Sequence, residues 1–191
     1  MVGLADVGAQ AARAAGRLVP DARSERRVEG THRLAPELGL TYAIVATTHN
    51  HSTPDLMGLW GPHPLRSGVD PLYREQVLAT AARVLAAAVA ALQPARLAVH
   101  EIPVAPEGLV ADTRPPLVYD NDLRALHFTA ADSGRTLGTV VSWGNHPETP
   151  WSRSTEITAD FCGFLRTVLE EGLVEGGEVL APGVGGIACF V

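Results

Sequence analysis

The segment LRALHFTAADSGRTLGTVVSW, residues 123–143, constrains the fold more than any other part of the chain. It contains two runs rich in apolar and β-branched residues, separated by the turn cluster Asp132, Ser133, Gly134 and Arg135. Two such runs joined by a short polar turn with glycine are typical of a β-hairpin. The segment therefore predicts an antiparallel β-hairpin.

A long helix is predicted to begin beside Asp70 and Pro71. Aspartate is a favoured N-cap residue, and proline at the first helical position loses no needed hydrogen bond. An apolar stripe at helical spacing follows until Pro94 stops the helix. The stripe consists of Leu72, Val77, Ala81, Val84, Leu85, Ala88 and Leu92. A second helix is predicted over FCGFLRTVLEEGL, with Asp160 as its N-cap.

Further strands are predicted over residues 40–47 and 95–102 and in the final run, residues 188–191. Helices and strands alternate without a regular βαβ rhythm, so the predicted class is α/β, with mixed-sheet α+β layers and helices packed on the faces of the strands. We expect residues 1–191 to form a single domain. Because the chain stops inside a strand-like run, we expect this fold to be incomplete at the C-terminus.

Composition excludes several classes of protein. The net charge is -6, so no basic face is available for a nucleic-acid partner. The two cysteines, Cys162 and Cys189, are far apart and give no disulfide framework, which favours a reducing compartment. The N-terminus lacks the features of a signal peptide, and the most apolar window, residues 77–92, is mostly alanine and carries Arg83. We therefore predict a cytoplasmic chain without a transmembrane segment.

Two apolar runs end in histidine. His49 and His51 follow the predicted strand 40–47, and His146 follows VVSW. Residues i and i+2 of a strand face the same side, and neighbouring strands bring their ends to one edge of a sheet. Imidazoles are common zinc ligands, so we predict that His49 and His146 approach within metal-sharing distance. His49, Asn50 and His51 form an HNH segment. In the alternative interpretation, one histidine of this HNH pair packs in the core and the other forms a hydrogen bond in a polar loop.

Other chemistries fit the sequence less well. His63, between two prolines, is a candidate third ligand but is more typical of an exposed loop. No G-x-S-x-G motif is present, and GVGG (183–186) precedes a strand instead of following one, unlike a dinucleotide fingerprint. Cys162 lies between Phe161 and Phe164 in the second predicted helix, which indicates a packed helix face instead of a reactive thiol.

Three segments of the chain resemble the neutral/alkaline non-lysosomal ceramidase family. They are ATTHNHSTPDLMGLWGP (46–62), TRPPLVYDNDLRALHF (113–128) and VSWGNHPETPWSRSTEITADFCGFLR (141–166). The family carries a THTHSGP-like segment and, later, an HPE segment followed by an Asp-Phe-x-Gly-Tyr-Leu-Arg-like helix start. The resemblance runs from about residue 35 onward. Asn50 in place of threonine, and Ser52 to Asp55 in place of Ser-Gly-Pro-Gly, are closer to the shorter bacterial relatives.

This resemblance implies part of an N-terminal catalytic domain of a zinc-dependent hydrolase of amide bonds, with an N-acyl amide or sphingolipid substrate. By motif, His49 and His146 would bind Zn²⁺, and His51 would act beside the metal as an oxyanion partner or proton carrier. Zinc would polarise the amide carbonyl and lower the pKa of a bound water. The apolar run of Leu56, Met57, Leu59 and Trp60 is either a lipid-contacting surface or part of the core.

The family's remaining ligands, a glutamate and a tyrosine, follow a strand that resembles GGIACFV, and the chain ends there, at Val191. Two further interpretations therefore stand beside the hydrolase. The chain is a truncated, catalytically inactive fragment that at most binds metal weakly, or it completes its zinc site through a partner chain.

Overall fold

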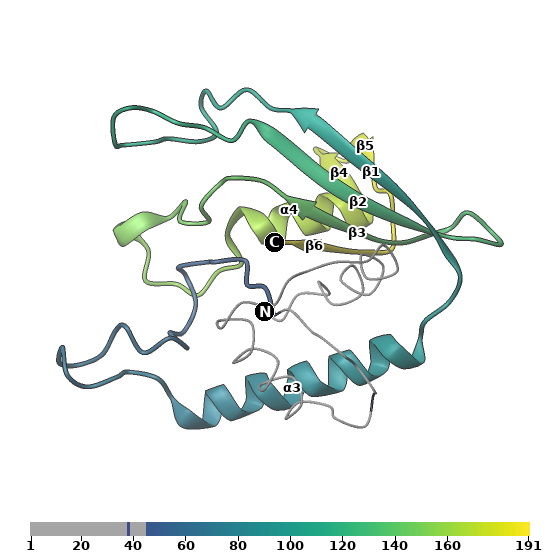
Figure 1. Ribbon diagram of the computed structural model, residues 1–191. Helices are drawn as coiled ribbons and strands as arrows, with labels where there is room; N and C mark the ends of the chain where they lie inside the picture. The colour runs from purple at the N-terminus through teal and green to yellow at the C-terminus, as the bar shows by residue number, and fades with distance from the viewer. Residues whose placement is uncertain (1–37, 39–44) are drawn as a thin grey trace. The chain divides into compact units, whose positions relative to one another are not determined.

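The computed structural model describes Leu38 and residues 45–191 (Figure 1). The chain divides into two compact units, one of residues 1–47 and 53–92 and the other of residues 48–52 and 93–191. Both helices and strands are present, so the mixed α/β class predicted from the sequence is confirmed. A single domain over residues 1–191 stays a prediction.

Helix α3 (Pro71–Ala90) is the longest helix in the part of the first unit that the structure describes, and it begins where the sequence predicts. The carboxylate of Asp70 accepts hydrogen bonds from the backbone N–H groups of Leu72 (2.8 Å) and Tyr73 (3.2 Å). These bonds satisfy two of the donors that have no partner within the first turn of a helix. The many alanines favour the helix because they lose little side-chain entropy, and the helix ends before Pro94.

The buried stripe of α3 is narrower than predicted. Ala81 and Leu85 are buried, whereas Leu72 is 76% exposed. Leu92, which lies beyond the end of the helix, is 55% exposed. Among the described residues, no helix combines the length and the apolar character that crossing a membrane requires.

The loop before α3 exposes a group of apolar side chains. The carboxylate of Asp55 organises this loop by accepting hydrogen bonds from the N–H groups of Met57 (2.7 Å), Gly58 (3.1 Å) and Trp60 (2.9 Å). Leu56, Met57, Leu59 and Trp60 are all exposed. Of the two predicted roles, a surface position therefore fits these side chains and a buried core position does not.

A four-stranded sheet forms the centre of the second unit, in the order β1-β2-β3-β6 (Figure 1). Its strands are β1 (Ala95–Pro103), β2 (Asp122–Ala130), β3 (Thr136–Ser142) and β6 (Ile187–Phe190). β1, β2 and β3 pair antiparallel, and β6 pairs parallel to β3. The predicted hairpin is confirmed as β2–β3, and the sheet is mixed.

The parallel pairing of β3 with β6 depends on a close approach of two backbones. A Cβ atom placed on Gly138 would lie 2.8 Å from the carbonyl oxygen of Ile187, which is closer than a side chain tolerates. Glycine at position 138 therefore allows β6 to join the sheet.

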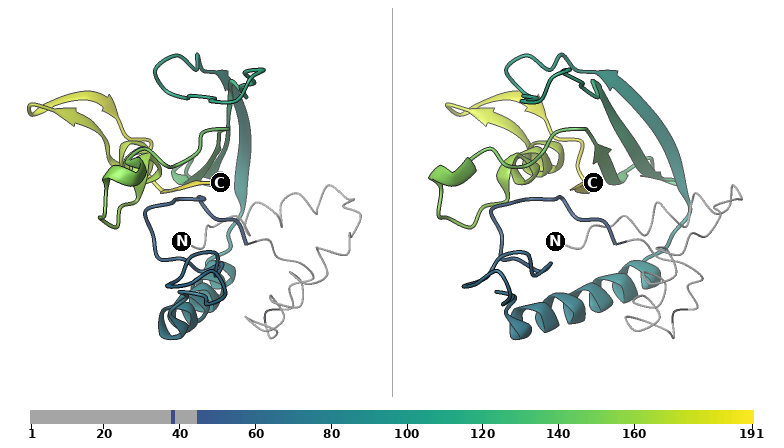
Figure 2. Two further views of the ribbon diagram at one scale, coloured as in Figure 1. Left: turned by 90° about the vertical axis from the view of Figure 1, so that its left-hand side faces the viewer. Right: turned by 60° about the vertical axis from the view of Figure 1, so that its left-hand side comes forward.

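Helix α4 (Asp160–Glu171) lies across one face of this sheet (Figure 2). Val141, Cys162 and Phe190 form the buried core between them. Leu123, Ala125, Trp143, Phe161, Leu165 and Leu169 pack around these residues. The rings of Phe161 and Phe190 meet edge to face, with centroids 5.2 Å apart and an interplanar angle of 82°. After α4, a small antiparallel sheet of β4 (Gly172–Glu175) and β5 (Glu178–Pro182) precedes β6.

Cys162 has the packing role predicted for it. Its side chain is buried in the core, and burial raises the pKa of the thiol to about 11, with the charge of Asp160 as a second cause. The thiol is therefore neutral at physiological pH and a poor nucleophile. The same prediction is wrong for Phe164, which is 65% exposed.

Two predicted elements need correction. The N-cap of α4 is Ala159, and Asp160 is the first residue of the helix, with a left-handed φ of 51°. The strand predicted over residues 40–47 lies mostly outside the described residues, and residues 45–47 have no regular secondary structure. The histidines at positions 49 and 51 therefore follow an irregular segment instead of a described strand.

Candidate metal site

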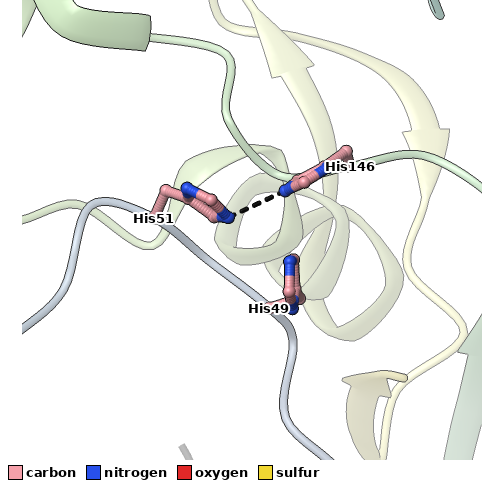
Figure 3. Close-up of side chains that lie close together, drawn as sticks. All are labelled: His49, His51 and His146. Atoms are coloured by element: carbon pink, nitrogen blue, oxygen red, sulfur yellow. Dashed lines mark hydrogen bonds between the residues drawn. The ribbon is translucent and has the colours of Figure 1, made fainter. Parts of the chain in front are cut away.

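Three histidine side chains converge in the second unit (Figure 3). His49 and His51 come from the segment 48–52, and His146 comes from the loop after β3. One nitrogen from each ring lies within 4.8 Å of the other two, and the Nε2 atoms of His51 and His146 are 2.8 Å apart. The predicted approach of His49 to His146 within metal-sharing distance is confirmed.

The third imidazole of this histidine cluster is His51. His63, the third ligand considered from the sequence, belongs to the first unit. Its Nδ1 accepts a hydrogen bond from the N–H of Leu65 at 3.1 Å, and it is not a member of the cluster.

Hydrogen bonds from Asn50 hold the segment that carries His49 and His51. The side-chain amide of Asn50 donates to the carbonyl of Thr158 at 2.7 Å, and its oxygen accepts from the N–H of Ser52 at 2.8 Å. The N–H of Thr158 donates back to the carbonyl of Ser52 at 3.1 Å. The HNH segment is thereby fastened to the residues that precede α4.

A second set of hydrogen bonds holds the loop that carries His146. The N–H of His51 donates to the carbonyl of Pro147 at 3.2 Å, which joins the two histidine segments directly. Pro147 is buried, whereas His146 is exposed and Glu148 is partly exposed. Thr149 donates its N–H (2.9 Å) and its hydroxyl (2.7 Å) to the carboxylate of Asp160. Both histidine segments are therefore attached to the start of α4.

Two residues of this network have unusual backbone conformations. His49 has a φ of 57° and Asp160 a φ of 51°, in the left-handed region that non-glycine residues seldom adopt. Such conformations persist when surrounding contacts impose them, and they cluster at functional sites. The strain at His49 therefore fits a segment shaped to present its side chain.

The electrostatics of the cluster favour neutral imidazole at His146. Partial burial lowers the pKa of His146, the nearby His49 and His51 rings lower it further, and Glu148 opposes them. A neutral imidazole is the form that binds a metal ion. The carboxylate of Glu148 lies 3.5 Å from Nδ1 of His51 and 4.0 Å from Nε2 of His146. This carboxylate places a negative charge beside His51.

The donor set fits a zinc ion. Zinc prefers imidazole nitrogen at about 2.0–2.1 Å in tetrahedral geometry, which sets its ligand nitrogens roughly 3.4 Å apart. All three rings lie at the surface, and their nitrogens are within 4.8 Å of each other. The three imidazoles are therefore close enough together to share one ion.

Sequence reasoning found the three histidines but missed the residues that hold them. Glu148 was visible as part of the HPE motif, two positions after His146, and this spacing was its only signal. Asp160 was interpreted as a helix cap because it precedes the predicted helix, and no local pattern indicates its partner Thr149, 11 residues earlier.

Comparisons with known proteins relate the chain to ceramidases by structure. No protein-family model and no curated protein matches the sequence. A solved structure described as ceramidase complexed with C2 matches with a TM-score of 0.59 and 18% identity, over 84% of this chain and 27% of that chain. A neutral ceramidase from Pseudomonas aeruginosa matches with a TM-score of 0.45 and 19% identity, over 61% of this chain and 19% of that chain.

The match at a TM-score of 0.59 shows that this chain shares a fold with part of a ceramidase. The chain spans about a quarter of the length of that ceramidase, 27%.

Proposed function

We propose that this protein takes part in ceramidase-like, metal-dependent hydrolysis of an amide bond in an N-acyl lipid. The observation that carries the proposal is the convergence of His49, His51 and His146 within 4.8 Å in a fold similar to part of a ceramidase. The alternative in which one histidine of the HNH pair is buried fits poorly, because both are exposed.

His49 and His146 are the proposed zinc ligands. The lowered pKa of His146 supports this role, because the ring stays neutral at physiological pH. A bound zinc ion would supply Lewis acidity toward the amide carbonyl and acidify water near it. The strained backbone of His49, with its φ of 57°, supports the same role for His49, because strained residues cluster at functional sites.

His51 is the proposed proton carrier. Its Nδ1 lies 3.5 Å from the carboxylate of Glu148, and its Nε2 lies 2.8 Å from Nε2 of His146. A carboxylate beside one nitrogen of an imidazole orients the ring and so aims the opposite nitrogen. His51 can therefore donate a proton from Nε2 to the leaving amine nitrogen and accept one from water.

A second candidate function is metal binding without turnover. It is supported by a metal-ligand cluster that, among the described residues, contains only imidazoles. Two imidazole ligands without a carboxylate hold zinc weakly. Loss of a partner that only orients a ligand already lowers metal affinity by about 10–100-fold, so with ligands themselves absent we expect micromolar affinity or poorer.

Hydrolysis of a short-chain N-acyl amide by the zinc-loaded chain tests the proposal. We expect release of the fatty acid to require zinc and to stop on addition of a chelator. His51→Ala should keep zinc affinity within about tenfold but lower kcat by about 10²–10⁴-fold, because it removes the acid–base group. Glu148→Gln keeps the shape of the carboxylate and should lower kcat less than His51→Ala does.

The same measurements separate the candidates. Zinc binding without turnover by the wild-type chain would support the second function. Equal loss of zinc affinity in His51→Ala and His49→Ala would contradict the proposed roles, because His51 would then be a ligand.

A further inference from the structure

We infer that Asp160 is a positioning residue for the histidine cluster, an inference that rests on the proposed function. The hydrogen bonds of Asp160 go to Thr149, Thr158 and Phe161 and to none of the three rings, so it acts through the turn that carries His146. Its carboxylate accepts two hydrogen bonds from Thr149, one from the backbone N–H at 2.9 Å and one from the hydroxyl at 2.7 Å. We call this arrangement the Asp160–Thr149 clamp.

The clamp spans residues that are distant in sequence but adjacent in the site. Thr149 follows His146, Pro147 and Glu148, and Asp160 opens helix α4. A turn that protrudes from a sheet loses considerable conformational entropy when it is held in one arrangement. Fastening Thr149 to a helix restricts this turn at one end, while β3 restricts it at the other.

Contacts on both sides of Asp160 hold its backbone and its carboxylate in place. Its φ of 51° places it in the left-handed region, and its own Oδ1 also accepts from the N–H of Phe161 at 2.6 Å. The hydroxyl of Thr158 accepts from the N–H of Asp160 at 3.1 Å. Aspartate tolerates left-handed φ better than most residues, and contacts on both sides of the residue are what hold such a conformation.

The clamp also connects the two histidine segments. Thr158 is the residue to which Asn50 donates, at 2.7 Å, and the N–H of His51 donates to Pro147 at 3.2 Å. The network therefore runs from His51 through Pro147 and Thr149 to Asp160, and back through Thr158 to Asn50. Loss of Asp160 removes the one side chain in this network that holds the His146 turn to α4.

Asp160→Gly is the decisive variant because glycine accepts a φ of 51° without strain but has no carboxylate. We expect its zinc affinity to fall by about 10–100-fold, the effect typical of removing a group that orients ligands. Asp160→Asn keeps one acceptor oxygen and tolerates the same backbone, so it should recover most of the lost affinity.

A matched control is available at the start of the other helix. Asp70 also accepts two hydrogen bonds from backbone N–H groups, but it belongs to the first unit and its partners are Leu72 and Tyr73 of its own helix. Asp70→Gly should lower thermal stability and leave zinc affinity unchanged. Equal zinc affinity in Asp160→Gly and the wild type would overturn the inference.

A readout without metal keeps the inference separate from the proposed function. Hydrogen exchange of the Thr149 amide in the zinc-free protein should be at least about tenfold faster in Asp160→Gly, because its acceptor is lost. If the wild-type chain binds no zinc, the proposed function fails, and this exchange rate alone decides whether the clamp exists. Unchanged exchange at Thr149 would refute the clamp.

Discussion

Replacing His49 with alanine will lower the affinity for zinc by at least about 100-fold, since loss of an outer-shell partner alone typically costs 10–100-fold. His49 is one of the two proposed ligands, and its nitrogen lies within 4.8 Å of those of His51 and His146. Isothermal titration calorimetry of the purified chain with zinc measures the change in affinity. His63→Ala is the matched control, because this exposed loop histidine is not part of the cluster.

Comparing glycine with alanine at position 49 separates the loss of zinc binding from the effect of backbone strain on stability. Glycine adopts a φ of 57° freely, whereas alanine in the left-handed region carries a penalty of roughly 1–2 kcal/mol. His49→Gly should therefore be more stable to urea than His49→Ala, although both lose zinc. Retention of wild-type affinity in either variant would remove His49 from the site.

Replacing Phe190 with alanine will lower the free energy of unfolding of the zinc-free protein by about 3–5 kcal/mol. Phe190 is only 4% exposed, belongs to the core with Val141 and Cys162, and meets Phe161 edge to face. Truncation removes the ring and leaves a cavity between β6 and α4. Urea unfolding followed by circular dichroism measures the change.

Phe164 provides the control for Phe190 because the same substitution is made at an exposed position. Its side chain is 65% exposed on α4, so Phe164→Ala should change stability by about 0.5 kcal/mol or less. Similar losses in the two variants would show that the β6–α4 contact is not the core of the second unit.

Local signals in the sequence were sufficient for most of the described elements. Asp70 and Pro71 mark the start of α3, and the turn around Gly134 joins β2 to β3, because caps and turns depend on residues adjacent in the chain. The sequence does not indicate which strand β6 pairs with, so its parallel pairing with β3 could not be predicted. It joins residues as distant as Gly138 and Ile187, and no local pattern specifies such a partner.

The approach of His49 to His146 was predicted correctly, but the local structure of the segment that carries His49 was not. The sequence placed His49 and His51 on one side of a strand end, whereas His49 has a left-handed backbone and residues 45–47 form no strand. Their convergence with His146 depends instead on long-range hydrogen bonds, such as that from Asn50 to Thr158. The roles of metal ligand and proton carrier assigned to these histidines remain predictions.

The most direct test of the central claim is a crystal structure of the zinc-soaked protein with anomalous data at the zinc absorption edge. We predict an anomalous peak about 2.0–2.1 Å from a ring nitrogen of each of His49 and His146, with His51 adjacent to it. No peak at the cluster at saturating zinc, or a peak bound by other residues alone, would contradict the assignment of His49 and His146 as the metal ligands.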